Sequence, residues 1–242
     1  AELRDQLQVK GLGTSSIQRN FGCINAVFNF VIKEHGLACR NAFTGVYLPN
    51  NQLNKKRKPI SIDSIGKLQI ECRAIDDDLR YLIGLISDSG LRLAEATGLM
   101  RQDLVLNTSK PHLIIRPHSH RSLKTVSSER IVPLVGTALW AAKKVSETGS
   151  SIYCFPRYTN KDGCNSNSAS AAINKWIKTI SGPNAVIHGL RHGFRDRLRA
   201  VEAPVDMIDQ LGGWSLRSVG QGYGDGYPLD LLHRWMQKIA LG

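Results

Sequence analysis

Side chains that could act on a phosphodiester lie in separate segments of the chain: Arg92, Lys124, His188, Arg191, and then Tyr223 or Tyr227. Arginine binds the non-bridging oxygens of a phosphate through paired hydrogen bonds and stabilises the charge that develops when phosphorus is attacked. Tyrosine can be the nucleophile, and lysine can protonate the departing oxygen. Together these residue types predict cleavage of a phosphodiester without a metal ion.

Both arginines are expected near helix starts. In SGLRLAEATGL, Gly90 ends one helix and Arg92 begins the next, and an ion pair with Glu95 one turn later is an equally good use of this arginine. In HGLRHGFRDRLRAV, His188 and Arg191 can point at one anion beside free backbone N–H groups. A solvated cationic face is the alternative for this helix. Its polar side is expected to carry His188, Arg191, His192, Arg195 and Arg199.

A basic patch surrounds Lys124, which is expected at the turn of a β-hairpin. Lysine at such a tip most often serves only solubility. Residues 110–130, however, contain several cations against a single acidic side chain, Glu129. The cations are Lys110, Arg116, Arg121, Lys124 and Arg130. This composition favours contact with a polyanion.

The stretch LGGWSLRSVGQGYGDGYPLDLL, residues 211–232, holds three aromatic side chains among glycines. Gly212 and Gly213 are expected to end a short helix and to present Trp214 just beyond it. Tyr223 follows nine residues later, and Tyr227 precedes the last helix. Each aromatic taken alone is more often a packing residue than a catalyst, so these residues leave the choice of nucleophile open.

The composition favours a nucleic-acid partner over an ordinary basic protein, because 32 Lys and Arg against 20 Asp and Glu give a net charge of +12. The densest cationic run is Lys55, Lys56, Arg57 and Lys58, for which a solvated surface turn is the alternative. Five scattered cysteines without a CxxC pair indicate a reducing compartment and no zinc site. Since neither a long apolar run nor a signal-peptide pattern is present, we expect a cytoplasmic protein with no membrane partner.

Apolar periodicity predicts a mainly helical protein with a small antiparallel sheet, an α+β fold. Strands are expected in DLVLN, HLIIRP and RIVPLV, between residues 103 and 135. The helices are expected at residues 14–37, 63–74, 77–87, 92–100, 136–147, 167–180, 189–201, 204–211 and 228–240.

Three regions are expected along the chain. Residues 1–50 are a partial helical DNA-binding domain, residues 51–61 a basic linker, and residues 62–242 a catalytic domain ending in a C-terminal helix. The amphipathic helix of the first region needs partner helices that about 50 residues can hardly supply. We therefore expect this domain to be truncated at its N-terminus.

In order and in type, these motifs resemble those of the tyrosine recombinases, the family of phage and integrative-element integrases, over residues 60–235. SGLRLAEATGL is similar to the first arginine box, LKTVSSERIVPL to the lysine hairpin with its Arg-hydrophobic-hydrophobic-Pro strand, and HGLRH to the His-x-x-Arg box. LGGWS resembles the Leu-Gly-His-Ser box, with Trp214 where histidine is usual. The family places that position nine residues before its nucleophile, which selects Tyr223 over Tyr227.

The resemblance implies a reaction and its residues. Tyr223 would attack a scissile phosphate, form a 3′-phosphotyrosyl link and release a 5′-hydroxyl. Arg92 and Arg191 would bind the phosphate, and Lys124 and His188 would transfer protons. The covalent link conserves bond energy, so the reaction needs no cofactor and no metal.

The resemblance also implies partners. Trp214 can donate a hydrogen bond but cannot shuttle protons, so it would position the tyrosine or hold the phosphate. Four protomers would assemble on two double-stranded DNA molecules at core-type sites, with the C-terminal helix docked on a neighbour and with accessory DNA-bending proteins as further partners. The expected DNA contacts are Lys55, Lys56, Arg57, Lys58, Arg116, Arg121, Arg130 and Arg195.

Three other functions are open at this point. Arg191-His192-Gly193 is the tripeptide of histidine phosphatases, but there it follows a strand near the chain start, whereas here it begins a helix. A catalytically silent DNA-binding module would share the basic surface but would not explain the retained set of chemical residues. A type IB topoisomerase would use similar chemistry without the integrase-like boxes.

Overall fold

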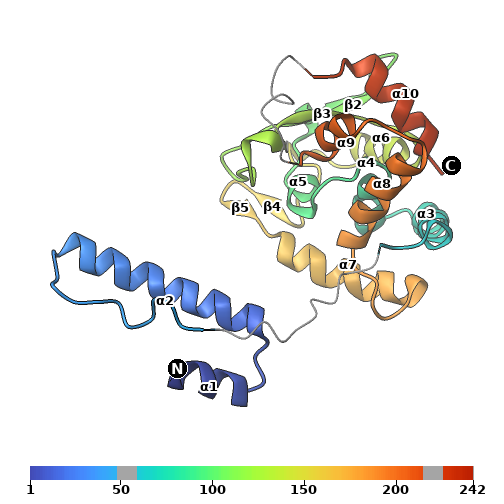
Figure 1. Ribbon diagram of the computed structural model, residues 1–242. Coiled ribbons are helices and arrows are strands. Elements are labelled where there is room, and N and C mark those ends of the chain that lie inside the picture. The colour runs from blue at the N-terminus through green and yellow to red at the C-terminus, as the bar shows by residue number, and fades with distance from the viewer. Residues whose placement is uncertain (48–58, 215–225, 242) are drawn as a thin grey trace. The chain divides into compact units, whose positions relative to one another are not determined.

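The computed structural model describes residues 1–47, 59–214 and 226–241 (Figure 1). The chain divides into two compact units, residues 1–57 and 58–242. The elements are, in order, α1 (Glu2–Val9), α2 (Thr14–Glu34), α3 (Ile62–Ile75), α4 (Asp78–Ser89), α5 (Leu93–Thr97), η1 (Arg101–Asp103), β1 (Leu104–Val105), β2 (His112–Ile115), η2 (Val126–Ser128), β3 (Arg130–Pro133), α6 (Gly136–Glu147), β4 (Thr159–Asn160), β5 (Gly163–Cys164), α7 (Ser166–Ser181), α8 (His188–Ala200), α9 (Val205–Gly212) and α10 (Leu229–Ile239).

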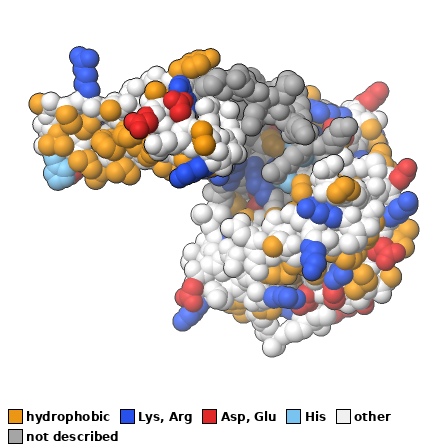
Figure 2. All heavy atoms as spheres, turned by 90° about the horizontal axis from the view of Figure 1, so that it is seen from below, with side chains coloured by type: hydrophobic (Ala, Val, Ile, Leu, Met, Phe, Trp, Pro, Cys, Tyr) orange, Lys and Arg blue, Asp and Glu red, His pale blue; other side chains and the backbone are white. Residues whose placement is uncertain are grey.

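The first unit consists of α1 and α2 with the segment that follows them. Ile17 and Phe21 of α2 are buried, and Phe43 packs edge-on against Phe21 with ring centroids 6.1 Å apart. Much of the apolar surface of this unit is exposed, as Figure 2 shows. The exposed apolar side chains include Val9, Val27, Phe28, Phe30, Val31, Leu37 and Tyr47.

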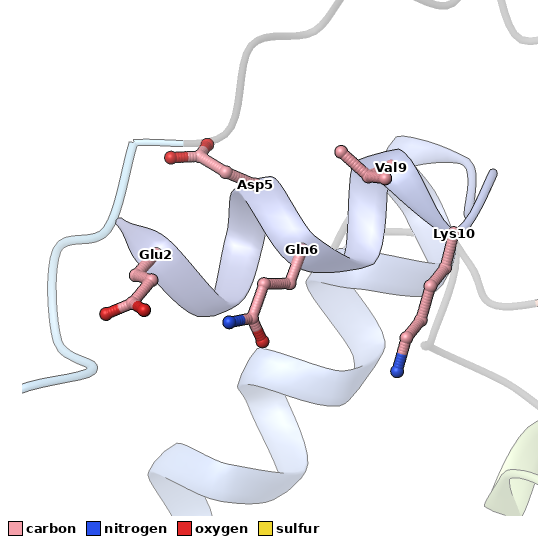
Figure 3. A pocket seen from close by; sticks show the side chains of 5 residues that line it. All are labelled: Glu2, Asp5, Gln6, Val9 and Lys10. Carbon is pink, nitrogen blue, oxygen red and sulfur yellow. The ribbon is translucent and has the colours of Figure 1, made fainter.

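Helix α1 contains no buried residue, and the sequence analysis did not anticipate it. A shallow hollow lies beside it (Figure 3). The hollow is lined by Glu2, Asp5, Gln6, Val9 and Lys10. None of these side chains belongs to the set expected to act on a phosphodiester.

Helix α4 is the central element of the second unit. Every residue from Tyr81 to Ser89 is buried, because α3, α5, α6, α7 and α8 all pack against this helix. Its first turn is capped by the Asp77 side chain, which accepts a hydrogen bond from the Arg80 N–H at 3.0 Å. It ends at Gly90, whose φ is 63°. Ending α4 here places Arg92 at the beginning of α5.

The three strands predicted between residues 103 and 135 form one antiparallel sheet in the order β1-β2-β3. Leu104 pairs with Leu113, and Ile115 pairs with Arg130. The segment from 116 to 129 that joins β2 to β3 is a long loop containing η2 rather than a tight turn. Lys124 therefore lies in the loop that joins the two strands of the expected hairpin, and this loop is longer than a tight turn. A second, two-stranded sheet of β4 and β5 was not anticipated.

The mainly helical α+β fold predicted from the sequence is confirmed. Leu232, Met236 and Ile239 of α10 are buried within their own unit, where α10 packs against α8 and β3. The expected docking of this helix on a neighbouring protomer stays a prediction. Within the described residues, no helix combines the length and the apolarity needed to cross a membrane.

Candidate active site

Arg92 lies at the start of α5 and joins three segments. Its Nη1 donates to Glu95 Oε1 at 2.6 Å and to Ser128 Oγ at 3.0 Å, and its Nη2 donates to the Gly213 carbonyl at 2.7 Å. The ion pair with Glu95, which the sequence offered as an alternative use of this arginine, is thus present. It is one part of a wider network that brings α5, η2 and the end of α9 together.

Glu95 is the buried carboxylate of this network. It accepts hydrogen bonds from the Arg92 backbone N–H at 2.9 Å and from Arg130 Nη2 at 2.9 Å. Burial by itself raises its pKa, but the charge of Arg130 and the hydrogen bonds from Arg130 and Arg92 outweigh burial and hold the pKa below its ordinary value. The sequence analysis recognised only the pair with Arg92. Its three-residue spacing was the available signal.

Arg191 approaches the same place from α8. Its Nη2 donates to the Gly212 carbonyl at 2.5 Å, and its Nη1 donates to the Gly90 carbonyl. The helical pattern put this residue on the polar side of α8, but it is buried because α8 packs against α4, α9 and α10. The alternative of a solvated cationic face therefore does not hold for Arg191.

The electrostatics of Arg191 favour an anion beside it. Burial, and then the nearby charge of Arg92, lower the pKa of Arg191 to about 9. Arginine keeps its proton in proteins, so this direction means that a buried cation lacks a full counter-charge. A bound phosphate would supply that charge.

Trp214 follows Gly213, which has a φ of 61° and ends α9 as the sequence predicts. Two guanidinium groups lie over its indole ring, with Arg191 Cζ at 4.4 Å and Arg195 Cζ at 4.5 Å from the ring centroid. A Cβ added to Gly212 would lie 1.8 Å from this ring. Only glycine therefore lets the indole fold back over the last turn of α9.

His188 and Lys124 are both exposed. His188 is the first residue of α8, and its ring meets that of His192 edge-on at 4.8 Å. Lys124 precedes Thr125, whose hydroxyl lies 2.9 Å from Ser128 Oγ, which in turn accepts a hydrogen bond from Arg92. The loop of Lys124 is thus tied to the arginine network through its next residue. The structure does not show the lysine amine within that network.

Of the two candidate nucleophiles, Tyr223 and Tyr227, only Tyr227 lies within the described residues. Tyr223 lies outside the described residues. The Tyr227 hydroxyl donates to Asp206 Oδ2 at 2.9 Å, and its backbone N–H donates to Gln210 Oε1 at 2.8 Å. Burial and then the hydrogen bond to Asp206 raise the pKa of Tyr227. The hydroxyl of Tyr227 is engaged in attaching the start of α10 to α9.

The expected DNA contacts separate into distinct groups. Lys55, Lys56, Arg57 and Lys58 lie outside the described residues. Arg116 is partly exposed and pairs with the buried Asp103 at 2.8 Å.

The other three expected DNA contacts lie further inside. Arg195 pairs with Asp209 at 2.9 Å beside Trp214. Arg121 and Arg130 are buried, because the sheet and its loop fold inward against α5 and the end of α9. The expectation that Arg121 and Arg130 lie on the DNA-facing surface is corrected.

Four guanidinium groups and two carboxylates meet around the end of α9, which leaves a positive surplus in a largely buried place. The groups are those of Arg92, Arg130, Arg191, Arg195, Glu95 and Asp209. Such an arrangement can bind a phosphate and stabilise additional negative charge on it. Among the described residues, no cluster of His, Cys, Asp and Glu is arranged to hold a metal ion.

The chain is similar to several known proteins. Residues 62–227 match the sequence model of the "Phage integrase family". Prophage integrase IntF of Escherichia coli (strain K12) is 25% identical over 170 residues, which are 66% of this chain and 35% of that protein. The chain thus spans about a third of the length of this relative.

Solved structures share the fold. The Tn1549 transposon integrase, in complex with circular intermediate DNA, gives a TM-score of 0.63 at 16% identity and covers 98% of this chain and 83% of its own. The XerH site-specific recombinase bound to its difH substrate gives 0.55 at 16% identity and covers 96% of this chain and 64% of its own. Because the family model covers α3 to α9 and reaches Tyr227, including both arginines, Trp214 and the sheet between them, this chain belongs to the phage integrase family of tyrosine recombinases.

Proposed function

We propose that this chain is a site-specific recombinase that cleaves and rejoins DNA through a 3′-phosphotyrosyl intermediate, with Tyr223 as the nucleophile. The observation that carries this proposal is the convergence of Arg92 and Arg191 on the adjacent carbonyl groups of Gly213 and Gly212. Two guanidinium groups from distant segments thus lie side by side with surplus positive charge. This geometry suits a phosphate whose two non-bridging oxygens each accept hydrogen bonds.

In the proposed step, the Tyr223 oxygen forms a bond to phosphorus while the bond from phosphorus to the 5′-oxygen breaks. His188 receives the tyrosine proton, and Lys124 gives a proton to the departing 5′-oxygen. Arg92 and Arg191 stabilise the charge on the pentacoordinate phosphorus. In the second step, the 5′-hydroxyl of a partner duplex attacks the phosphotyrosyl link, so one phosphoester bond is exchanged for another and no ATP is consumed.

Trp214 acts in this proposal by position. Its ring lies against Arg191 and Arg195. Its indole N–H can donate one hydrogen bond but does not shuttle protons. Tyr227 supports the choice of nucleophile indirectly, because its hydroxyl is already bonded to Asp206. This favours Tyr223, which the family spacing selects, as the nucleophile.

The proposed substrate is double-stranded DNA with core-type recombination sites, and the proposed outcome is integration or excision of a phage or other mobile element. The net charge of +12 supports a polyanionic substrate. The structure of the Tn1549 integrase contains circular intermediate DNA, and that of XerH contains its difH substrate. Four protomers on two duplexes, the basic linker crossing the DNA backbone, and accessory DNA-bending proteins complete the proposed assembly.

Two alternative functions have less support. A silent DNA-binding module would not need Arg92 and Arg191 to converge on the adjacent carbonyl groups of Gly213 and Gly212. The phosphatase tripeptide Arg191-His192-Gly193 lies within α8, where Gly193 faces Ile65 and His192 is exposed. Neither the family match nor this helical position fits a phosphatase.

The proposal is tested with a DNA substrate nicked close to the cleavage site, so that the released fragment diffuses away and the covalent adduct accumulates. Incubated in EDTA, the wild-type protein should form an adduct that survives denaturation. Tyr223→Phe should form none while its DNA affinity stays unchanged. The matched control is Tyr227→Phe, which should still form the adduct.

An adduct that persists in Tyr223→Phe and disappears in Tyr227→Phe would assign the nucleophile to Tyr227 instead. Wild-type protein that binds DNA but forms no adduct on any nicked substrate would favour the silent binding module.

A further inference from the structure

Arg130 occupies an unexpected place for a residue of the basic patch. Its side chain is 3% exposed. We infer that Arg130 is a positioning residue that holds three segments of the proposed active site in fixed relation to one another. This inference rests on the proposed function, because it concerns the geometry of those catalytic residues.

The guanidinium group of Arg130 uses each of its nitrogens on a different segment. Nη2 donates to Glu95 Oε2 of α5 at 2.9 Å. Nη1 donates to the Ser128 carbonyl at the end of η2 at 2.6 Å. Nε donates to the Leu211 carbonyl near the end of α9 at 2.8 Å. Arg130 itself begins β3, so four elements meet at one side chain.

Each of these contacts leads directly to a residue of the proposed reaction. Glu95 and the Ser128 hydroxyl both hold Arg92. Ser128 also bonds Thr125, the residue after Lys124.

The third contact leads to the other arginine and to the tryptophan. Leu211 is followed by Gly212, whose carbonyl accepts a hydrogen bond from Arg191. Trp214 lies two residues beyond Gly212. The packing is close, since a Cβ on Gly213 would lie 2.6 Å from Arg130 Nη1. A shift of Arg130 would therefore move both phosphate-binding arginines and the tryptophan.

Lysine cannot perform this function. A planar guanidinium donates in fixed directions to several acceptors at once, whereas an ammonium is a point charge that would have to leave some of them. Burial also prevents Arg130 from contacting a DNA phosphate where it lies. A positioning residue and a phosphate-contacting residue thus predict different effects of the same substitution.

The test compares Arg130→Lys with the wild-type protein on the nicked substrate. The single-turnover rate of adduct formation at saturating DNA should fall about 10- to 100-fold, because small misplacements of catalytic groups have effects of this size. The dissociation constant for DNA and its dependence on salt concentration should stay as in the wild type, since no phosphate contact is lost. Arg130→Gln, which also removes the charge, is measured alongside, and the rates are compared at a temperature at which circular dichroism shows each variant to be folded.

Arg197→Lys is the matched control. Arg197 is equally buried at 4% side-chain exposure and pairs with Asp88 at 2.7 Å, while it also donates to the Ile239 carbonyl at 2.8 Å. Its partners lie in α4 and α10 and include no residue of the proposed reaction. Below its melting temperature, this variant should form the adduct at the wild-type rate even if it loses as much stability as Arg130→Lys.

Coupling through Glu95 gives a second readout. If Arg130 acts partly by holding Glu95, the fold-decrease in the rate of adduct formation in the double variant should be smaller than the product of the fold-decreases in Arg130→Lys and Glu95→Gln.

A wild-type rate in Arg130→Lys and in Arg130→Gln would overturn the inference. So would weaker DNA binding with a reduced salt dependence and an unchanged saturated rate. Absence of an adduct in the wild-type protein would instead overturn the proposed function.

Discussion

Single buried charges determine how the residues of the candidate site are held. Glu95 accepts hydrogen bonds from Arg92 and Arg130, and no other carboxylate among the described residues is bonded to both arginines. Removing one member of a buried ion pair costs far more than the pair contributes, because the partner is left buried and uncompensated. The Glu95 carboxylate therefore compensates the charge of two arginines at once.

Glu95→Gln should lower the free energy of unfolding at neutral pH by about 3–5 kcal/mol, the cost of leaving buried partners unpaired. Because the folded protein holds the pKa of Glu95 below its ordinary value of 4.5, its contribution is complete above that pH and is lost as the pH falls through the folded pKa. Denaturant unfolding of both proteins across this range measures the difference.

The exposed Glu129→Gln is the control for this experiment and should change stability by less than about 0.5 kcal/mol. A difference between wild type and Glu95→Gln that persists unchanged into strong acid would contradict the ion-pair explanation.

At this scale the sequence predicted residue types better than residue positions. Arg92 and Trp214 lie at helix ends where the motifs put them. The sequence indicated that Glu95 can pair with Arg92 but not that it also pairs with Arg130. Glu95 and Arg130 are 35 positions apart and meet only when β3 packs beside α5. Periodicity likewise put Arg191 on the polar side of its helix, because the pattern of one helix does not reveal which other elements pack against that side.

Helices were predictable as elements wherever one apolar face repeats, so α3, α4 and α6 to α10 begin and end within a few residues of their expected limits. The strands β4 and β5 were not, because two-residue strands have no periodicity to detect. The pattern of α10 showed that it has an apolar face but not what covers that face. The structure answers this with α8 and β3.

Packing of α10 within its own unit predicts that Met236→Ala destabilises the protein in the absence of DNA. Met236 is fully buried, and truncating such a side chain costs about 2–5 kcal/mol. The melting temperature of dilute, DNA-free protein should therefore fall clearly. The neighbouring exposed residue supplies the control, because Gln237→Ala should leave the melting temperature nearly unchanged. An unchanged melting temperature in Met236→Ala would mean that α10 is not packed on its own unit in solution.

Charge is the property that acts over the whole molecule. A net charge of +12 accompanies a second unit in which several arginines are consumed by internal ion pairs, including Arg130, Arg195 and Arg197. Contacts to the DNA backbone away from the scissile phosphate must then come from exposed cations rather than from these. The overall charge could be predicted from the sequence, whereas its division between interior and surface could not.

DNA affinity should fall steeply with salt, because each phosphate contact releases counterions and contributes about −0.9 to the slope of log affinity against log salt. Fluorescence anisotropy with a labelled duplex at several salt concentrations measures this slope. Lys124→Ala should make the slope shallower if its exposed amine contacts a phosphate, while the internally paired Arg197→Lys should leave the slope as it is. A flat titration of the wild-type protein would argue against an extended phosphate interface.

The two guanidinium groups over the ring of Trp214 also bear on an exchange of this residue for histidine. A histidine introduced by Trp214→His would lie close to Arg191 and Arg195, and both would repel its protonated form. The imidazolium form would therefore be disfavoured at this position. The choice of aromatic ring is thus coupled to the charge of Arg195, and substitutions at these two positions should not be independent of one another.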